Sequence, residues 1–258
     1  MTTLAEMMLE TARVVGNVFE STATGGSTTT LVDTRLQAEA DFYRDGTLWV
    51  LDGDNAGLCD VVTSFLENTL TIESTLTDAI VAGNSYAVAD GKFPKRMLKQ
   101  AILASLTKEK VMKINSSLSV TADTEDYALP TGVSDVRRVE VATTASGSYE
   151  INYFWREMDG RLYFMKGKEP KTAGRTIRLY YAALHGTIGD SDAINDAIDL
   201  NLLKWRGVVH LYRNYMQRMY KDEPQIIDLL NEAKVNEAQA LARRVPPTFN
   251  RDPIHTGW

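Results

Sequence analysis

The chain has 258 residues, a formal net charge of -6 and a pI near 5.2, with 44% hydrophobic and 24% charged side chains. This composition is typical of a globular protein that buries a sizeable core, in one large domain or two small ones. Proteins that coat DNA need clustered Lys and Arg to neutralise phosphates, so the acidic balance excludes a DNA-coating role.

The charge is divided unevenly along the chain. Residues 1–89 carry 13 acidic and 3 basic side chains, a net of -10, which leaves +4 for the remainder and predicts two modules. The single cysteine, Cys59, excludes an intrachain disulfide, and we expect it to be a small buried residue in a strand. The first twenty residues lack a basic leader, and no apolar run reaches the roughly 18 residues of a spanning helix. We therefore expect neither a secretion signal nor a membrane span.

The N-terminal part begins with helical signals and continues with strand signals. Thr3 and Glu6 make a possible capping box, and apolar residues recur at helical spacing, which predicts an amphipathic helix over residues 3–19. The composition of Ser21–Thr30, STATGGSTTT, is typical of a flexible linker. Short β-branched and aromatic runs then predict a small acidic β-module that ends near Asp90.

The rest of the chain alternates between helical and strand signals. We predict helices at about 93–111, 193–220 and 223–244, and a β-insert at 112–186. Asp192 is the expected N-cap of the second of these helices, which should form a hairpin with the third and pack on the first. In the insert, apolar residues alternate with polar ones, which predicts antiparallel strands with one buried face.

Together these elements predict an α+β fold: a helical bundle with an inserted antiparallel β-section, plus a small N-terminal β-module. The predicted domains are 1–90, the N-terminal helix and acidic β-module; 91–244, the helical core with its insert; and 245–258, an extended C-terminal arm. The prolines hold this arm extended, and its large apolar side chains show no pattern that would bury them internally. We expect the arm to bind a partner through Pro246, Pro247, Phe249, Ile254 and Trp258.

No motif in the sequence points to catalysis. His185, His210 and His255 stand in no paired metal-ligand spacing, so we expect each to be structural. The loop Asp52–Gly57 resembles the start of a calcium loop, but Thr63 occupies the position of the bidentate glutamate, which favours a hairpin turn.

Two charged clusters also have structural interpretations. Arg137 and Arg138 are adjacent in a strand, so they should point to opposite faces and cannot form one phosphate clamp. Carboxylates in the first turns of a helix are favoured by the helix dipole alone, which accounts for Asp190, Asp192, Asp196 and Asp199. We predict no catalytic residue, no cofactor and no metal ligand, and we do not expect an enzyme.

One segment carries a resemblance to a known family. Asp126–Val141, DYALPTGVSDVRRVEV, resembles the Tyr-x-Leu-Pro turn and following strand of head-to-tail adaptor proteins of tailed bacteriophages, of the podovirus tail-tube type. The order of a helix, an aromatic-rich β-section and two helices over residues 91–244 is similar to the core of these adaptors. The segments STTTLVDTRL, GTLWVLDGDNAG and AIVAGNSYAVAD also resemble a β-module of phage virion and neck proteins.

The resemblance implies a non-enzymatic virion protein that is assembled in the bacterial cytoplasm. It implies a homo-oligomeric ring, a dodecamer, that binds the portal protein above and a tail or nozzle protein below. Genomic DNA would pass through the ring without specific binding, and no membrane would be involved. One alternative is another tail component, a tail terminator or a fibre-attachment protein, in which the β-module makes the essential contact; a virion-associated hydrolase is the other.

Overall fold

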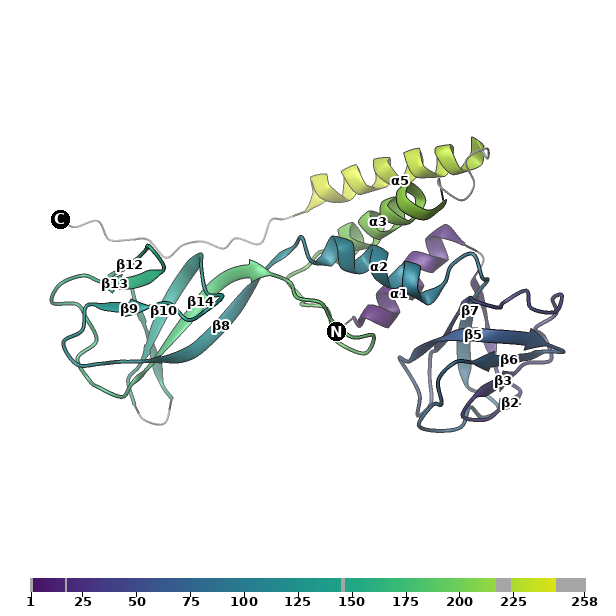
Figure 1. The fold of residues 1–258 in the computed structure, drawn as a ribbon, viewed down its shortest axis with the longest axis horizontal. Coiled ribbons are helices and arrows are strands. Elements are labelled where there is room, and N and C mark those ends of the chain that lie inside the picture. Colours follow the sequence, from purple (N-terminus) through teal and green to yellow (C-terminus); the bar gives the residue numbers. More distant parts are fainter. Residues whose placement is uncertain (1, 17, 145–146, 217–223, 245–258) are drawn as a thin grey trace. The chain divides into compact units, whose positions relative to one another are not determined.

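The computed structural model describes residues 2–16, 18–144, 147–216 and 224–244 (Figure 1). The chain forms two compact units. One comprises the described residues of Met1–Lys108 and of Gly186–Val245, and the other comprises those of Glu109–His185. A compact unit can hold more than one sequence module, so the domain boundaries expected at residues 90 and 244 stay predictions.

Antiparallel β-sheet, rather than helix, dominates the described part of the chain. Its strands form sheets of seven, four and three members. The described helices are α1 (Leu4–Val15), α2 (Lys95–Leu106), α3 (Leu200–Leu211) with the following π-helix η1 (Tyr212–Met216), and α5 (Pro224–Arg243). The predicted α+β fold, a helical bundle with an inserted antiparallel β-section, is therefore wrong. Helices were predicted too long, and residues taken for a linker form strands.

The seven-stranded sheet of the first unit closes on itself. Its order is β1-β7-β4-β5-β6-β3-β2, and the end strands β1 and β2 follow one another in the chain. At the joint, Ala23 N donates to Asn84 O on one side and Thr24 N donates to Val32 O on the other. Closure leaves no free edge, so the module is a small β-barrel. Its strands are β1 (Val18–Thr22), β2 (Gly25–Gly26), β3 (Thr30–Val32), β4 (Thr47–Val50), β5 (Cys59–Leu66), β6 (Thr69–Ile72) and β7 (Ser85–Ala89).

The expected linker Ser21–Thr30 is part of this barrel. Its threonines are β-branched and favour strands, and a Cβ added to Gly26 would lie 2.4 Å from Thr30 O, so the turn requires glycine. Composition could not show that strands far along the chain would pair with this segment. The barrel interior is filled by apolar side chains, among them Leu31, Leu48, Val62, Phe65, Leu70, Ile80, Tyr86 and Val88.

The predicted capping box is confirmed at the start of the N-terminal helix. The Thr3 side chain accepts from Glu6 N, and the Glu6 carboxylate accepts from Thr3 N. The helix ends at Val15 rather than at residue 19. Phe19 lies instead in β1, with its ring centroid 6.3 Å from that of Tyr86.

Two of the later helices depart from the prediction, whereas α5 (Pro224–Arg243) agrees with the helix predicted at 223–244. α2 ends at Leu106 because the chain enters strand β8 at Lys110, and α3 begins at Leu200 rather than near 193. Asp199, not Asp192, is the N-cap of α3, with its carboxylate accepting from Leu202 N at 3.0 Å. The chain before Asp199 pairs with the N-terminus instead, where Ile194 N donates to Thr2 O.

Helices α1, α2 and α3 pack together in the first unit, and α3 also packs on α5. The approach of α2 to α3 depends on a small residue, because a Cβ added to Gly207 would lie 2.6 Å from Ile102 Cδ1. Ile102 is fully buried at this contact. The expected hairpin of the last two helices extends partly over residues 217–223, which lie outside the described residues.

The second unit is an antiparallel β-insert between α2 and α3. The chain enters it through β8 and leaves through β14, which pair along most of their length (Figure 1). A four-stranded sheet of order β11-β10-β14-β8 packs on a three-stranded sheet of order β12-β13-β9 around Val139, Trp155, Leu162 and Leu179. The strands are β8 (Lys110–Ser119), β9 (Asp126–Ala128), β10 (Val136–Ala142), β11 (Tyr149–Asn152), β12 (Trp155–Met158), β13 (Arg161–Phe164) and β14 (Thr176–Leu184). The antiparallel pairing predicted for this segment is confirmed.

The turn before β4 provides a test of the barrel's packing. A Cβ on Gly46 would lie 2.1 Å from Ala89 O and 2.8 Å from Tyr43 O, and both are backbone atoms that cannot move aside. We expect Gly46→Ala to lower the free energy of unfolding by about 2 kcal/mol, measured by chemical denaturation. Gly25→Ala is the matched control in the same barrel, since nothing lies within 4 Å of its added Cβ. Equal stability of the two variants would contradict the close approach.

Candidate functional site

The predicted binding residues of the C-terminal arm are Pro246, Pro247, Phe249, Ile254 and Trp258, and all five lie outside the described residues. The arm therefore stays a prediction. Candidate sites among the described residues are of three kinds: a partly buried ionic network in the first unit, a polar and aromatic sheet face in the second unit, and a depression on the barrel.

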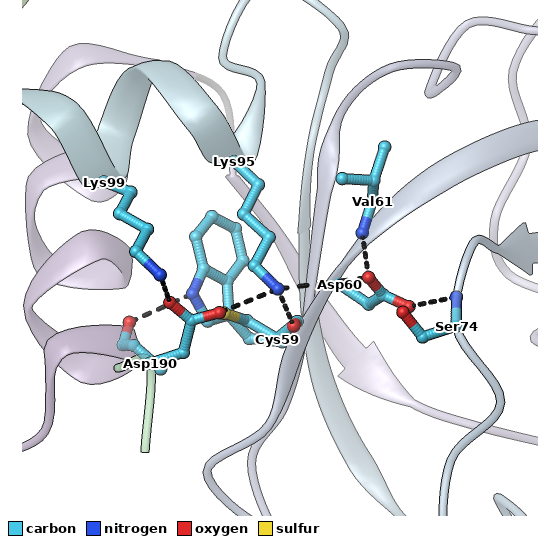
Figure 2. A network of polar contacts seen from close by, with 9 residues as sticks. Cys59, Asp60, Val61, Ser74, Lys95, Lys99 and Asp190 are labelled. Atoms are coloured by element: carbon cyan, nitrogen blue, oxygen red, sulfur yellow. Dashed lines mark hydrogen bonds and ion pairs between the residues drawn. The ribbon is translucent and has the colours of Figure 1, made fainter. Parts of the chain in front are cut away.

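The ionic network joins three segments that are far apart in the sequence (Figure 2). Lys95 Nζ, on α2, lies 2.9 Å from Asp190 Oδ2 and donates to Cys59 O of β5 at 2.6 Å. Lys99 Nζ, one turn along α2, donates to Asp190 Oδ1 at 2.7 Å. Asp60 Oδ1 is more distant, 3.9 Å from Lys95 Nζ, and is held by backbone donors instead, as its two oxygens accept from Val61 N and Ser74 N.

The charges in this network are mutually stabilised. Burial alone would raise the pKa of Asp190, but the ammonium groups of Lys99 and Lys95 more than offset it and hold the pKa below its usual value. Burial likewise acts to lower the pKa of Lys95, and the nearby Asp190 reverses this, so the pKa is raised. A lysine held charged in this way is a poor nucleophile or base, so the network is an anchor rather than a catalytic group.

Cys59 is also inert in this setting. Burial raises the pKa of its thiol to about 12, against a partial lowering by Lys95. The thiol is therefore protonated at neutral pH and cannot act as a thiolate. Its place at the start of β5, 8% exposed, confirms the prediction of a small buried residue in a strand.

The backbone next to Asp190 extends the anchor to the N-terminus. Ala5 N donates to Asp190 O at 2.9 Å and Leu4 N donates to Asp192 O at 3.1 Å. The indole of Trp49, on β4, donates in turn to Ala5 O at 3.0 Å. The barrel, α1, α2 and the segment before α3 therefore meet at one cluster of polar contacts.

A fully buried carboxylate, Asp33, stabilises the barrel. Its side chain is fully buried and accepts from Tyr86 Oη at 2.9 Å and from Arg35 N at 3.0 Å. Burial would raise the pKa of Asp33, but hydrogen bonds from Ser21, Arg35 and Tyr86 lower it below its usual value. Burial, with a further contribution from Asp33, raises the pKa of Tyr86. These groups are satisfied within the fold and leave no free acid or base.

The four-stranded sheet carries a polar and aromatic face on the side away from its core. Glu140, on β10, accepts from Tyr180 Oη at 3.0 Å and forms ion pairs with Arg138 and with Arg178. The Arg178 guanidinium lies 3.6 Å from the centroid of the Tyr149 ring, on β11. Such Arg–Tyr pairs are rigid and planar and are common in protein interfaces. Polar and apolar residues alternate in VRRVEVA and in IRLYY, and this alternation could have predicted the polar face, which we did not predict from the sequence.

The barrel carries a depression of about 700 Å³ that includes Phe19, Ala38, Glu39 and Phe42 in its lining. The Phe42 side chain is 48% exposed and its ring meets Tyr43 edge-on, with centroids 4.9 Å apart. An exposed aromatic ring at the rim of an open depression suits a contact with another protein. No reacting group lines it in an arrangement suited to catalysis.

The Tyr-x-Leu-Pro segment has a structural role in the second unit. Tyr127 is buried, and its hydroxyl both accepts from Thr121 N and donates to Thr121 O. Its ring meets Phe164 edge-on at 5.8 Å. After it, Val133 N donates to Pro130 O and closes the turn that leads to β10. The segment therefore fixes how the two sheets of the insert pack together.

The structure accounts for the other residues considered from the sequence. The loop Asp52–Gly57 is a hairpin turn, because β4 and β5 pair antiparallel on either side of it and Gly57 N donates to Val50 O at 2.9 Å. Arg137 pairs with Asp135 and Arg138 with Glu140, so the two cations form no common clamp.

The carboxylates before α3 and the histidines also have structural surroundings. Asp190, Asp192 and Asp199 accept from Lys99, Gly189 N and Leu202 N respectively. His185 follows β14 and is buried, and His210 lies on α3, where burial and Lys108 lower its pKa. His255 lies outside the described residues.

Within the described ranges, no three His, Cys, Asp or Glu side chains gather as metal ligands would. Among the same residues, no helix is both long and apolar enough to cross a bilayer. No protein-family model matches the sequence, and no curated protein is significantly similar to it. The function must therefore be argued from the residues and the geometry above.

The ionic anchor can be tested by removing its central charge. We expect Lys95→Met to lower the free energy of unfolding by about 2 kcal/mol. This loss is smaller than for a buried ion pair in which one charge is left without any partner, because Lys99 remains beside Asp190. Thermal and urea melts would measure this. Lys110→Met is the matched control, because its pair with Asp135 is exposed and should contribute about 0.5 kcal/mol or less. Similar losses in both variants would show that Lys95 is no anchor.

The lowered pKa of Asp190 predicts how stability depends on pH. Its contribution is complete above the unfolded pKa of about 4 and is lost as pH falls through the lower pKa of the folded state. The difference in free energy of unfolding between the wild type and Asp190→Asn should therefore be constant from about pH 7 to 5 and shrink toward pH 2. Urea melts at each pH measure it. A difference that grows on acidification would contradict the assignment.

Proposed function

We propose that this protein is a structural subunit of the head-to-tail connector of a tailed bacteriophage. In this role it forms a homo-oligomeric ring, a dodecamer by the resemblance, between the portal protein and a tail or nozzle protein of the virion. DNA passes through the ring, and the subunit contributes surfaces rather than a reacting group. The proposal rests on the resemblance of residues 91–244 to the adaptor core.

The observation that carries this proposal is the order of the elements. Helix α2 is followed by the β-insert Glu109–His185, and then by α3 and α5. α2 and α3 pack together although the insert separates them in the sequence, and α3 packs on α5. The Tyr-x-Leu-Pro segment lies within the insert, with Tyr127 at its core. This order is the one expected from the resemblance of the sequence to the adaptors, and it supports the proposal.

One observation favours the alternative of a tail terminator or fibre-attachment protein. The barrel presents the exposed Phe42 ring at the rim of its depression, which is a contact surface outside the adaptor core. In that alternative, Phe42→Ser abolishes binding to the essential partner. In the connector, the same variant still assembles on the portal.

The connector role is tested by cryo-EM of the full-length chain mixed with its cognate portal, beside a chain that ends at Arg244. We expect the full-length chain to form a ring on the portal and the shortened chain to lose it, because the aromatic residues of the arm supply anchoring contacts. Circular dichroism of the shortened chain is the control for folding. If both chains bind, the role stands and the arm is not needed. If neither binds, the connector proposal is wrong.

A further inference from the structure

Among the described residues, the four-stranded sheet of the insert ends in two edge strands, each paired on one side only. β11 pairs with β10 and β8 pairs with β14, and each lies at an end of the sheet. All three pairings in the sheet are antiparallel, so the two edge strands run in opposite directions. A second copy of this sheet placed edge to edge in the same orientation would therefore bring its β11 antiparallel to β8. Exposed edges of this kind are templates for pairing with another chain.

The free backbone groups of both edges can be identified from the hydrogen bonds at the ends of the ladders. His185 N donates to Glu109 O, and continuing this ladder by two residues turns Val111 and Lys113 toward β14. Met112 and Ile114 therefore turn their N–H and C=O groups outward. By the same argument, Thr143 N donates to Ser148 O, which turns Glu150 toward β10 and leaves the groups of Tyr149 and Ile151 outward.

The side chains at the two edges are complementary in charge. Lys113 on β8 lies opposite Tyr181, and Glu150 on β11 lies opposite Val141, so both are on the side of the sheet that faces the insert's core. Glu150 is exposed, and close to it Glu169 has an oxygen that is buried without a hydrogen-bond partner. One edge strand therefore carries a lysine and the other a glutamate.

On the opposite side, which carries the polar and aromatic face of the sheet, the side chains of the two edge strands are uncharged. Ile114 is 57% exposed, and Met112 is half-buried on the same side. On β11 the residues of that side are Tyr149 and Ile151, both half-buried. Each edge strand thus carries a charged side chain on one face and uncharged side chains on the other.

We propose that β8 of one copy pairs with β11 of a second copy, in an antiparallel register that places Lys113 opposite Glu150. This register puts Ile114 opposite Tyr149 and Met112 opposite Ile151. The outward backbone groups of these two residue pairs then meet as hydrogen-bonded pairs, and Lys113 and Glu150 form the intervening non-hydrogen-bonded pair, where side chains lie closest.

The register is determined by the length and the irregularity of the two strands. β11 has four residues, which match Val111–Ile114, the regular part of β8. Beyond Asn115 the pairing of β8 is interrupted at Ser116 and Ser117, so a shift in that direction would meet a bulge. A shift of two residues the other way would place Val111, not Lys113, opposite Glu150. Pairing of β8 with another β8 is disfavoured, since it would bring two copies of Lys113 together on one face.

This contact joins two different edges, so it is heterologous and continues from copy to copy, as a closed ring or an open chain. It rests on the proposed connector ring for its biological setting, and it specifies how neighbouring subunits would meet. Four residues on each side make a small contact, so the pairing is best detected by trapping it covalently at high protein concentration or on the portal.

The test uses full-length chains with Cys59→Ala, so that no other thiol competes. Lys113→Cys and Glu150→Cys are made separately and together, and are oxidised under mild conditions. We expect disulfide-linked dimers when the two single variants are mixed, almost none from either alone, and a ladder of multimers from the double variant. Dimers from Lys113→Cys alone would show pairing of β8 with itself and would overturn the proposal. Thermal melts are the control for folding.

Charge exchange provides an independent measurement on chains without added cysteines. Lys113→Glu or Glu150→Lys alone should weaken self-association about tenfold in sedimentation equilibrium, and the two together should restore it. Lys110→Glu is the control, since its residue lies outside the paired segment and already contacts Asp135. No loss in the single variants, or no recovery in the double variant, overturns the proposed register.

The two proposals fail separately in these experiments. A ring on the portal without cross-links between positions 113 and 150 overturns the strand pairing and leaves the connector function intact. Specific cross-links in a protein that does not bind the portal support the pairing and overturn the connector function.

Discussion

The ion pair between Lys95 and Asp190 is the interaction on which the arrangement of the first unit depends. Lys99 and Asp190 are 91 residues apart in the sequence, and the β-insert lies between them. The carboxylate fixes the segment before α3 against α2, while Lys95 also reaches the backbone of β5. Because even a partly buried charge is costly without a partner, these groups favour the arrangement in which they are paired. The helices and the barrel are thereby held together.

The barrel and the insert differ in their strand edges, because the sheet of the barrel is closed and the four-stranded sheet of the insert is open. In the barrel, β1 continues into β2, and this one segment pairs with both β7 and β3, so no edge is left. In the insert, the four-stranded sheet ends in β8 and β11, whose outer backbone groups face away from the sheet. A closed sheet is suited to independent stability, whereas an open one is suited to association. The edge strands that could pair with another copy therefore lie in the insert, within the segment that resembles phage adaptors.

The surfaces of the insert suit a structural role better than a reacting site. The ionisable groups on its polar face are paired with one another, as Glu140 is with Arg138, Arg178 and Tyr180. In the first unit, Asp33 and Asp190 are equally satisfied within the fold. Rigid sheet faces with defined charge and apolar stripes are features that specify how subunits meet.

The sequence by itself determined the local features of this protein. The Thr3–Glu6 capping box follows from residues within a few positions of each other, and the alternation of apolar with polar residues along the insert predicts strands with one buried face. Only the tertiary structure decided the closure of the barrel through Ser21–Thr30, the use of Asp199 rather than Asp192 as a helix cap, and the partner of Lys95. Each of these depends on pairing between distant segments, whose free energy exceeds the small local preferences that a sequence pattern reports. For the same reason, the sequence could not predict that β8 and β11 are the edge strands, since strand order is a property of the folded sheet.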